Sequence, residues 1–255
     1  MVLKRDGPIL WEELSWKDIE ELTRETKMAI LPVAATEQHG PHLPLCVDTL
    51  EGYEIAKRIS SRTRIPVLPP IVYGCSQGHG SFPGTLSVRP ETLSRVVREI
   101  CEWLYKSGIR KVILLNCHAW NLGPLLSAKE DLRADHLDLQ VRVLSPLDIA
   151  VRAAKEYVAD VDDPNHAHGN VAETAEVLSL RPDLVDLSAA VDEQDKPYFF
   201  EYRMDQISQS GAIGKPSNAT KEFGERMLEA ITAELIPIIE LAKKESSPDR
   251  DHNSA

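Results

Sequence analysis

Short apolar runs alternate along the chain with longer segments whose apolar residues recur at helical spacing. The apolar runs are typical of buried strands and lie at residues 28–34, 65–72, 111–116 and 140–144. The segments of helical spacing lie at 48–61, 90–107, 121–132, 172–180 and 219–244. Strands separated by helices of this length predict an α/β fold, with a mainly parallel sheet covered by helices on both faces.

Two features qualify this outline. Pro66, Pro69 and Pro70 interrupt the second apolar run, so we expect an irregular strand there. The chain has 255 residues without a repeat or an internal linker, which favours one domain over residues 1–244. The remaining residues, 245–255, are polar and are predicted to be disordered.

Composition excludes several classes of partner. The net charge of −11 and the pI of about 5.2 argue against nucleic acid and anionic membranes. No run approaches the roughly 18 apolar residues that a membrane span needs. The N-terminus has a basic pair but lacks an apolar stretch that would make it a signal peptide, and the four cysteines are widely spaced. We therefore expect a cytoplasmic protein with reduced thiols and a small-molecule substrate.

Ligand-type side chains follow two of the predicted strands. Glu37, His39 and Asp48 come after the strand at 28–34, and His118 follows the strand at 111–116. Ligands of open parallel sheets bind beyond the carboxyl ends of the strands, where these two loops converge. Carboxylate oxygens and imidazole nitrogens together suit zinc, manganese or iron(II), and one carboxylate can bridge two ions. The pattern predicts a metal site at this edge.

Simpler roles remain open for single residues. Asp48 stands at a predicted helix start, where it could serve only as an N-cap. His42 shares the loop and is expected to orient a ligand or to pack, and we assign no role to Cys46. Prolines and Gly40 in the same loop predict a stiff segment that holds its ligands in place.

Five segments, in order, resemble the creatininase family of metal-dependent amidohydrolases. EQHGPHLPLCVD (37–48) is similar to the family's EQHGPHLPLGTD, and GCSQGHGSFPGTLSV (74–88) is similar to its G-x-S-x-x-H-x-x-FPGT segment. NCHAWN (116–121) stands where the family has NGHGGN, and HGNVAETAEVL (168–178) matches HAGExETSxML in part. GAIGKPSNATKEFG (211–224) resembles the C-terminal G-x-x-G-x-P-x-x-A-x-x-x-x-G segment. The resemblance implies a three-layer α/β/α sandwich, two divalent metal ions and, often, a homohexamer.

The resemblance also assigns metal ligands. It implies that Glu37, Asp48 and His118 hold one ion. It implies that His39 and Asp48 hold the other, with Asp48 bridging.

The second ion needs a further carboxylate. In creatininase itself the segment equivalent to NCHAWN supplies it, but here that position is Trp120, which cannot ligate. Glu173 is the best replacement, although it could instead be an exposed helix acid.

The resemblance assigns the proton transfer to His168, which has the family's five-residue offset from Glu173. A histidine suits general acid–base work because its ordinary pKa lies near neutrality. His166 is a rival for this role. Ser76 and His79 stand where the family lines its pocket, although either could simply cap a turn.

These assignments predict hydrolysis of a C–N bond by water activated between two metals. The expected substrate is a small, neutral, cyclic amide, beside which Trp120 would form an apolar wall or stack on a flat ring. Family members with other activities leave an acyclic formamide or a keto-inositol as alternatives. A catalytically silent protein that binds metal and ligand is the alternative from another class, and a purely structural hexamer would leave the ligand-type residues unexplained.

Overall fold

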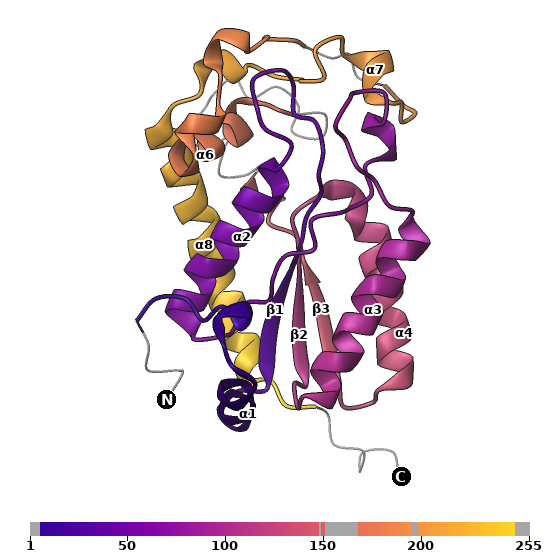
Figure 1. Ribbon diagram of the computed structural model, residues 1–255, viewed down its shortest axis with the longest axis vertical. Coiled ribbons are helices and arrows are strands. Elements are labelled where there is room, and N and C mark those ends of the chain that lie inside the picture. Colours follow the sequence, from indigo (N-terminus) through magenta and orange to yellow (C-terminus); the bar gives the residue numbers. More distant parts are fainter. Residues whose placement is uncertain (1–5, 148, 151–167, 195–197, 248–255) are drawn as a thin grey trace.

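A parallel three-stranded sheet forms the centre of the protein in the computed structural model (Figure 1). The strand order is β1 (Met28–Val33), β2 (Lys111–Asn116) and β3 (Gln140–Leu144). The register pairs Ile30 with Ile113. The structure describes residues 6–147, 149–150, 168–194 and 198–247.

Helices cover both faces of the sheet (Figure 1). One face carries α2 (Val47–Thr63) and α8 (Lys221–Lys244), and α6 (Val171–Leu180) packs against both of them beyond the end of the sheet. The other face carries α3 (Pro90–Lys106) and α4 (Leu122–Asp135). The short helices α1 and α7 span Trp16–Glu25 and Met204–Ile207.

Alternate residues of β1 divide the hydrophobic core between these two layers. Ile30 packs in a cluster with residues of α2 and α8, whereas Leu31 packs with residues of α3 and α4. Successive side chains of a strand point to opposite faces, so a strand covered on both sides is apolar throughout. All six residues of β1 are buried. The predicted three-layer α/β/α sandwich with a parallel sheet is confirmed.

The expected strand at 65–72 is only a set of isolated bridges. Val67 bridges Ile30 and Ile71 bridges Val33, both in parallel. The run still follows β1, because the Ile30 N–H donates to the carbonyl of Pro66 at 2.9 Å. The physical reason for the broken ladder is that each proline lacks an N–H donor. The prediction of four strands is therefore wrong by one.

The helix ends agree with the punctuation of the sequence. α3 has Pro90 in its first turn, and Gly108, with φ of 99°, follows its end. α8 begins after Thr220, whose hydroxyl accepts a hydrogen bond from the Phe223 N–H at 3.2 Å. None of the helices in the described part of the chain is long and apolar enough to cross a membrane. The domain limits stay a prediction, and residues 248–255 lie outside the described residues.

Candidate metal centre

The loop after β1 is closed by backbone contacts. The Glu37 N–H donates to the carbonyl of Leu45 at 3.0 Å. Gly40 has φ of 80°, and a Cβ there would lie 2.9 Å from the Cβ of Ala212. A side chain at this position would therefore meet both backbone strain and a neighbour. The glycine lets the loop turn tightly and keep Glu37 beside the end of the sheet.

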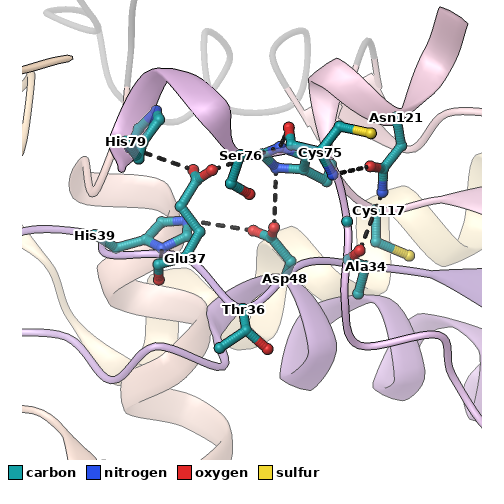
Figure 2. Close-up of polar contacts among 12 residues, drawn as sticks. Ala34, Thr36, Glu37, His39, Asp48, Cys75, Ser76, His79, Cys117 and Asn121 are labelled. Atoms are coloured by element: carbon teal, nitrogen blue, oxygen red, sulfur yellow. Dashed lines mark hydrogen bonds and ion pairs between the residues drawn. The ribbon is translucent and has the colours of Figure 1, made fainter. Parts of the chain in front are cut away.

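Asp48 lies between the imidazoles of His39 and His118, and Figure 2 shows its contact with His39. Its Oδ1 is 3.2 Å from Nε2 of His39, and its Oδ2 is 3.0 Å from Nδ1 of His118. The N-cap of α2 is Cys46, and Asp48 stands in the first turn of the helix. The N-cap interpretation of Asp48 is therefore wrong. Its carboxylate is directed to the site instead.

Backbone carbonyls orient both of these imidazoles. Nδ1 of His39 lies 3.1 Å from the carbonyl oxygen of Glu37, and Nε2 of His118 lies 3.0 Å from that of Cys75. A carbonyl oxygen only accepts, so these two nitrogens carry the proton of the neutral ring. In the neutral rings, Nε2 of His39 and Nδ1 of His118 would therefore carry the lone pairs, and both face Asp48. This is the arrangement in which histidines bind metals.

The carboxylates contain oxygens that suit a cation. Glu37 is only 1% exposed. Its Oε2 is buried and accepts no hydrogen bond from the described residues. An unsatisfied buried carboxylate oxygen is costly unless a positive charge is nearby. The residues present therefore fit divalent ions.

The two carboxylate oxygens of Glu173 have different partners. Its Oε2 accepts from the Gly169 N–H at 2.6 Å and completes a capping box with Asn170 at the start of α6. Its Oε1 lies 4.0 Å from Nε2 of His39. The side chain is 21% exposed, so the alternative of an exposed helix acid does not describe it. One oxygen remains available to a metal beside His39.

The ligands predicted for the first ion are adjacent but are not gathered around one point. The ring of His118 stands between Glu37 and Asp48, and its Nε2 lies 3.5 Å from Oε2 of Glu37. Binding one ion through all three requires Glu37 to turn toward Nδ1 of His118. Among the described residues, two other trios lie within reach of a single ion: Glu37–His79–His168 and His39–His168–Glu173.

Without metal, protonated His39 and His118 supply positive charge beside the carboxylates. Burial opposes protonation of His39, but Asp48, followed by Glu173 and Glu37, raises its pKa to about 10. Burial likewise opposes protonation of His118, but the charges of Glu37 and Asp48 raise its pKa to about 9. Burial also opposes ionisation of Asp48, but the two imidazoliums hold its pKa well below its usual value. Two positive charges on the histidines thus offset part of the negative charge of the carboxylates.

His168 lies beside the two predicted metal positions. Its ring stacks on His39 with centroids 4.3 Å apart, and its backbone pairs with Ile213. Burial, followed by the charges of His39 and His79, lowers the pKa of His168 well below its ordinary value. Its role in proton transfer stays a prediction. His166, the rival, lies outside the described residues.

The three predicted substrate-binding residues differ in access. Ser76 is 0% exposed and lies near the carboxylate of Glu37 (Figure 2), and His79 is 5% exposed. Trp120 is 40% exposed, and its ring contacts His79 edge-on with centroids 5.7 Å apart. A Cβ on Gly78 would lie 1.9 Å from Cη2 of Trp120, so this ring packs directly on the glycine. Of these three residues, only Trp120 is substantially exposed to solvent.

Sequence reasoning missed three polar residues around the site. Gln38 lies between two predicted ligands in EQHG, and its amide contacts both His79 and His168. Glu51 and Glu176 face each other from α2 and α6, and burial raises the pKa of both. Only the position of Gln38 in the motif could have singled it out. By contrast, His42 binds the hydroxyl of Thr174 at 2.9 Å, which agrees with the expected packing role.

Known proteins resemble this chain in sequence. A creatinine amidohydrolase from Pseudomonas putida is 34% identical over 235 residues, covering 85% of this chain and 90% of that protein. A mycofactocin precursor peptide peptidase from Mycolicibacterium smegmatis is 30% identical over 236 residues, covering 88% of this chain and 87% of its own.

Solved structures extend the similarity to metal-bound proteins. A mutant creatininase described as Zn-Zn type matches with a TM-score of 0.84 and 30% identity, covering 94% of this chain and 100% of that one. A structure described as creatininase Mn matches with a TM-score of 0.83 and 29% identity, covering 93% and 100%. The sequence model of the family described as creatinine amidohydrolase matches residues 12–239. The chain therefore belongs to the creatininase family of hydrolases.

Proposed function

We propose that this chain is a two-metal hydrolase that cleaves the C–N bond of a small cyclic amide. The observation that carries the proposal is the position of Asp48 between Nε2 of His39 and Nδ1 of His118. Zinc is the proposed ion, with manganese and iron(II) as alternatives, because oxygen and imidazole ligands suit all three. Glu37 joins Asp48 and His118 at one ion, and Glu173 joins Asp48 and His39 at the other.

The protein's own groups account for the remaining steps. Two bound divalent ions would lower the pKa of a shared water and polarise the substrate carbonyl. His168 donates through Nε2 to the backbone carbonyl of Gln38 at 2.7 Å, so its Nδ1 is the nitrogen that exchanges protons. A neutral His168 accepts the proton of the attacking water and then passes it to the leaving nitrogen.

The exposed ring of Trp120 favours the proposal of a flat, uncharged substrate. Its partly exposed ring provides an apolar surface next to His79. Four of the five motifs, at 36–48, 74–88, 116–121 and 168–178, contain no Lys or Arg, which disfavours a phosphate-bearing substrate. We therefore favour a neutral ring over the alternatives, an acyclic formamide or a keto-inositol. A cytoplasmic location and a homo-oligomer, a hexamer by the family's example, belong to the same proposal.

The first experiment is the metal content per subunit of the wild type and of Glu173→Gln, purified without chelator and with zinc or manganese supplied. The glutamine retains an acceptor for the Gly169 N–H but loses the charge that would bind the ion. Asn170→Ala is the matched control, because it breaks the other half of the capping box. We expect two equivalents in the wild type and the control, and one in Glu173→Gln.

Other results would redirect the proposal. Two equivalents in Glu173→Gln would remove Glu173 from the second metal shell. Fewer than two in the wild type would contradict the two-metal mechanism and favour the silent binder. Hydrolysis rates on cyclic amides, acyclic formamides and keto-inositols then separate the substrate classes. A fully metallated protein inactive on all of them would also support the silent binder.

A further inference from the structure

The side-chain amide of Gln38 has a fixed orientation. Its Oε1 accepts from the Gly40 N–H at 2.9 Å, and its Nε2 donates to the carbonyl of Gly211 at 2.9 Å. Two backbone partners of opposite kind decide which end is oxygen and which is nitrogen. Gln38 is 5% exposed, so water does not compete strongly for these bonds.

Gly211 provides the space for this amide. It has φ of 80°, and a Cβ there would lie 2.1 Å from Oε1 of Gln38. Any side chain at this position would displace the amide, in addition to straining the backbone. Gly211, the first glycine of the C-terminal GAIGKP segment, therefore helps to hold the side chain of Gln38, which lies 173 positions earlier in the chain.

The fixed amide determines the tautomer of His79. One N–H of the Gln38 amide donates to the carbonyl of Gly211, and the other points to Nδ1 of His79, 2.8 Å from the amide nitrogen. Nδ1 must therefore accept, and the neutral ring carries its proton on Nε2.

The backbone of the same residue determines the tautomer of His168. Nε2 of His168 lies 2.7 Å from the carbonyl oxygen of Gln38, which can only accept. That nitrogen therefore carries the proton. The contact of 3.3 Å between the amide nitrogen of Gln38 and Nε2 of His168 then joins two donors and is not a hydrogen bond.

Both engaged nitrogens face Glu37. Its Oε1 lies 3.5 Å from Nδ1 of His79 and 3.6 Å from Nε2 of His168, and this trio is one that could hold an ion. We propose that Gln38 is a positioning residue that keeps His79 and His168 out of the metal shells. Glu37 is thereby reserved for the ion beside His118. This inference rests on the proposed function, since it assumes that metals bind.

Four imidazoles are thus sorted into two pairs. In His39 and His118 the nitrogen that faces Asp48 is free in the neutral ring, because the opposite nitrogen donates to a backbone carbonyl. In His79 and His168 the nitrogen that faces a carboxylate is already engaged by Gln38. Of the ring nitrogens that face Asp48 or Glu37, only Nε2 of His39 and Nδ1 of His118 are therefore available to ions.

Neutron diffraction from crystals of the metal-free wild type tests the tautomers directly. We expect deuterium on Nε2 of both His79 and His168, in about tenfold excess over the other nitrogen, because the wrong tautomer of His79 would set two donors against each other. Deuterium chiefly on Nδ1 of His79 would overturn the inference. This measurement needs no variant, so it decides even if substitutions at Gln38 prevent folding.

Gln38→Met tests the consequence for metal binding. Methionine has a similar length but no amide, so it frees Nδ1 of His79. With excess zinc, we expect the metal content to rise by one equivalent and an anomalous zinc peak to appear between Glu37 and His79. The exposed Gln209→Met is the control and should bind as the wild type does. A Gln38→Met protein with wild-type zinc positions would contradict the inference.

The two proposals can fail separately. If the wild type binds fewer than two ions, the proposed function fails, while the deuterium positions in the metal-free protein still report the role of Gln38. If the wild type binds two ions but His79 or His168 ligates one of them, the inference on Gln38 fails and the two-metal hydrolase stands.

Discussion

Nδ1 of His118 lies 3.0 Å from Oδ2 of Asp48, so the loop after β2 meets the first turn of α2 at one carboxylate. The opposite oxygen of Asp48 faces His39 at 3.2 Å. The proposed metal centre therefore depends on Asp48 more than on any other single residue.

Asp48→Asn should lose both ions. An amide cannot bridge two cations as a carboxylate does, so we expect the metal content to fall below one equivalent. Hydrolysis should decrease more than about 100-fold, beyond the loss typical of outer-shell partners. Metal analysis and steady-state rates test this, with the exposed Asp135→Asn at the end of α4 as the control. Two retained ions would show that Asp48 does not bridge.

Metal binding should release protons. The pKa values of His39 and His118, raised to about 10 and about 9, mean that both rings are charged at pH 7 in the metal-free protein. Because a metal binds only the neutral ring, loading at pH 7 should release about two protons. Metal affinity should therefore rise with pH up to about 10. Calorimetry in two buffers of different ionisation enthalpy measures the number released, and a value near zero would contradict the raised pKa values.

Gly78→Ala should displace Trp120, because its Cβ would lie 1.9 Å from Cη2 of that ring. We expect a loss of about 1–3 kcal/mol in unfolding free energy and a raised KM. The double variant Gly78→Ala/Trp120→Ala should recover the stability but not the KM. Thermal unfolding and KM measurements distinguish the two effects.

Gly123→Ala is the matched control, since nothing lies within 4 Å of a Cβ there. It lies in α4, where alanine favours the helix, so we expect an unchanged KM and no loss of stability. A Gly78→Ala protein that behaves like this control would show that the contact with Trp120 is unimportant.

Glu176→Gln should stabilise the metal-free protein at high pH. Burial and then the charge of Glu173 raise the pKa of Glu176 to about 8 in the folded protein, from 4.5. The folded state holds a proton that the unfolded state releases, so wild-type stability falls as the pH rises from about 4.5 to about 8. Glutamine has no such proton. At pH 8.5 the variant should therefore exceed the wild type by about 2–4 kcal/mol.

The difference should vanish near pH 4.5, where Glu176 is protonated in both states. Chemical denaturation at several pH values measures it, with the exposed Glu222→Gln in α8 as the control. Parallel pH curves for the wild type and Glu176→Gln would show that Glu176 does not hold its proton in the folded protein.

The spacing of apolar residues and the positions of proline and glycine determined most of the secondary structure. The apolar run of β1 is uniform because the strand is buried on both faces, and the ends of α3 follow from Pro90 and Gly108. The order of strands and helices then predicted a mainly parallel sheet, which brings the loops that carry His39 and His118 to one edge. A helix-start position, however, does not reveal where a carboxylate points, and Asp48 was therefore open to the wrong interpretation as an N-cap.

Only the tertiary structure decided which atoms are free to react. The position of α6 relative to His39 decides which oxygen of Glu173 caps the helix and which one faces His39. The tautomers of His79 and His168 depend on Gln38, whose amide is oriented by a glycine 173 positions away. Residue types and spacing can identify a group of potential ligands. Hydrogen bonds between distant segments determine which nitrogen of each ring has a lone pair, and these bonds exist only after the chain has folded.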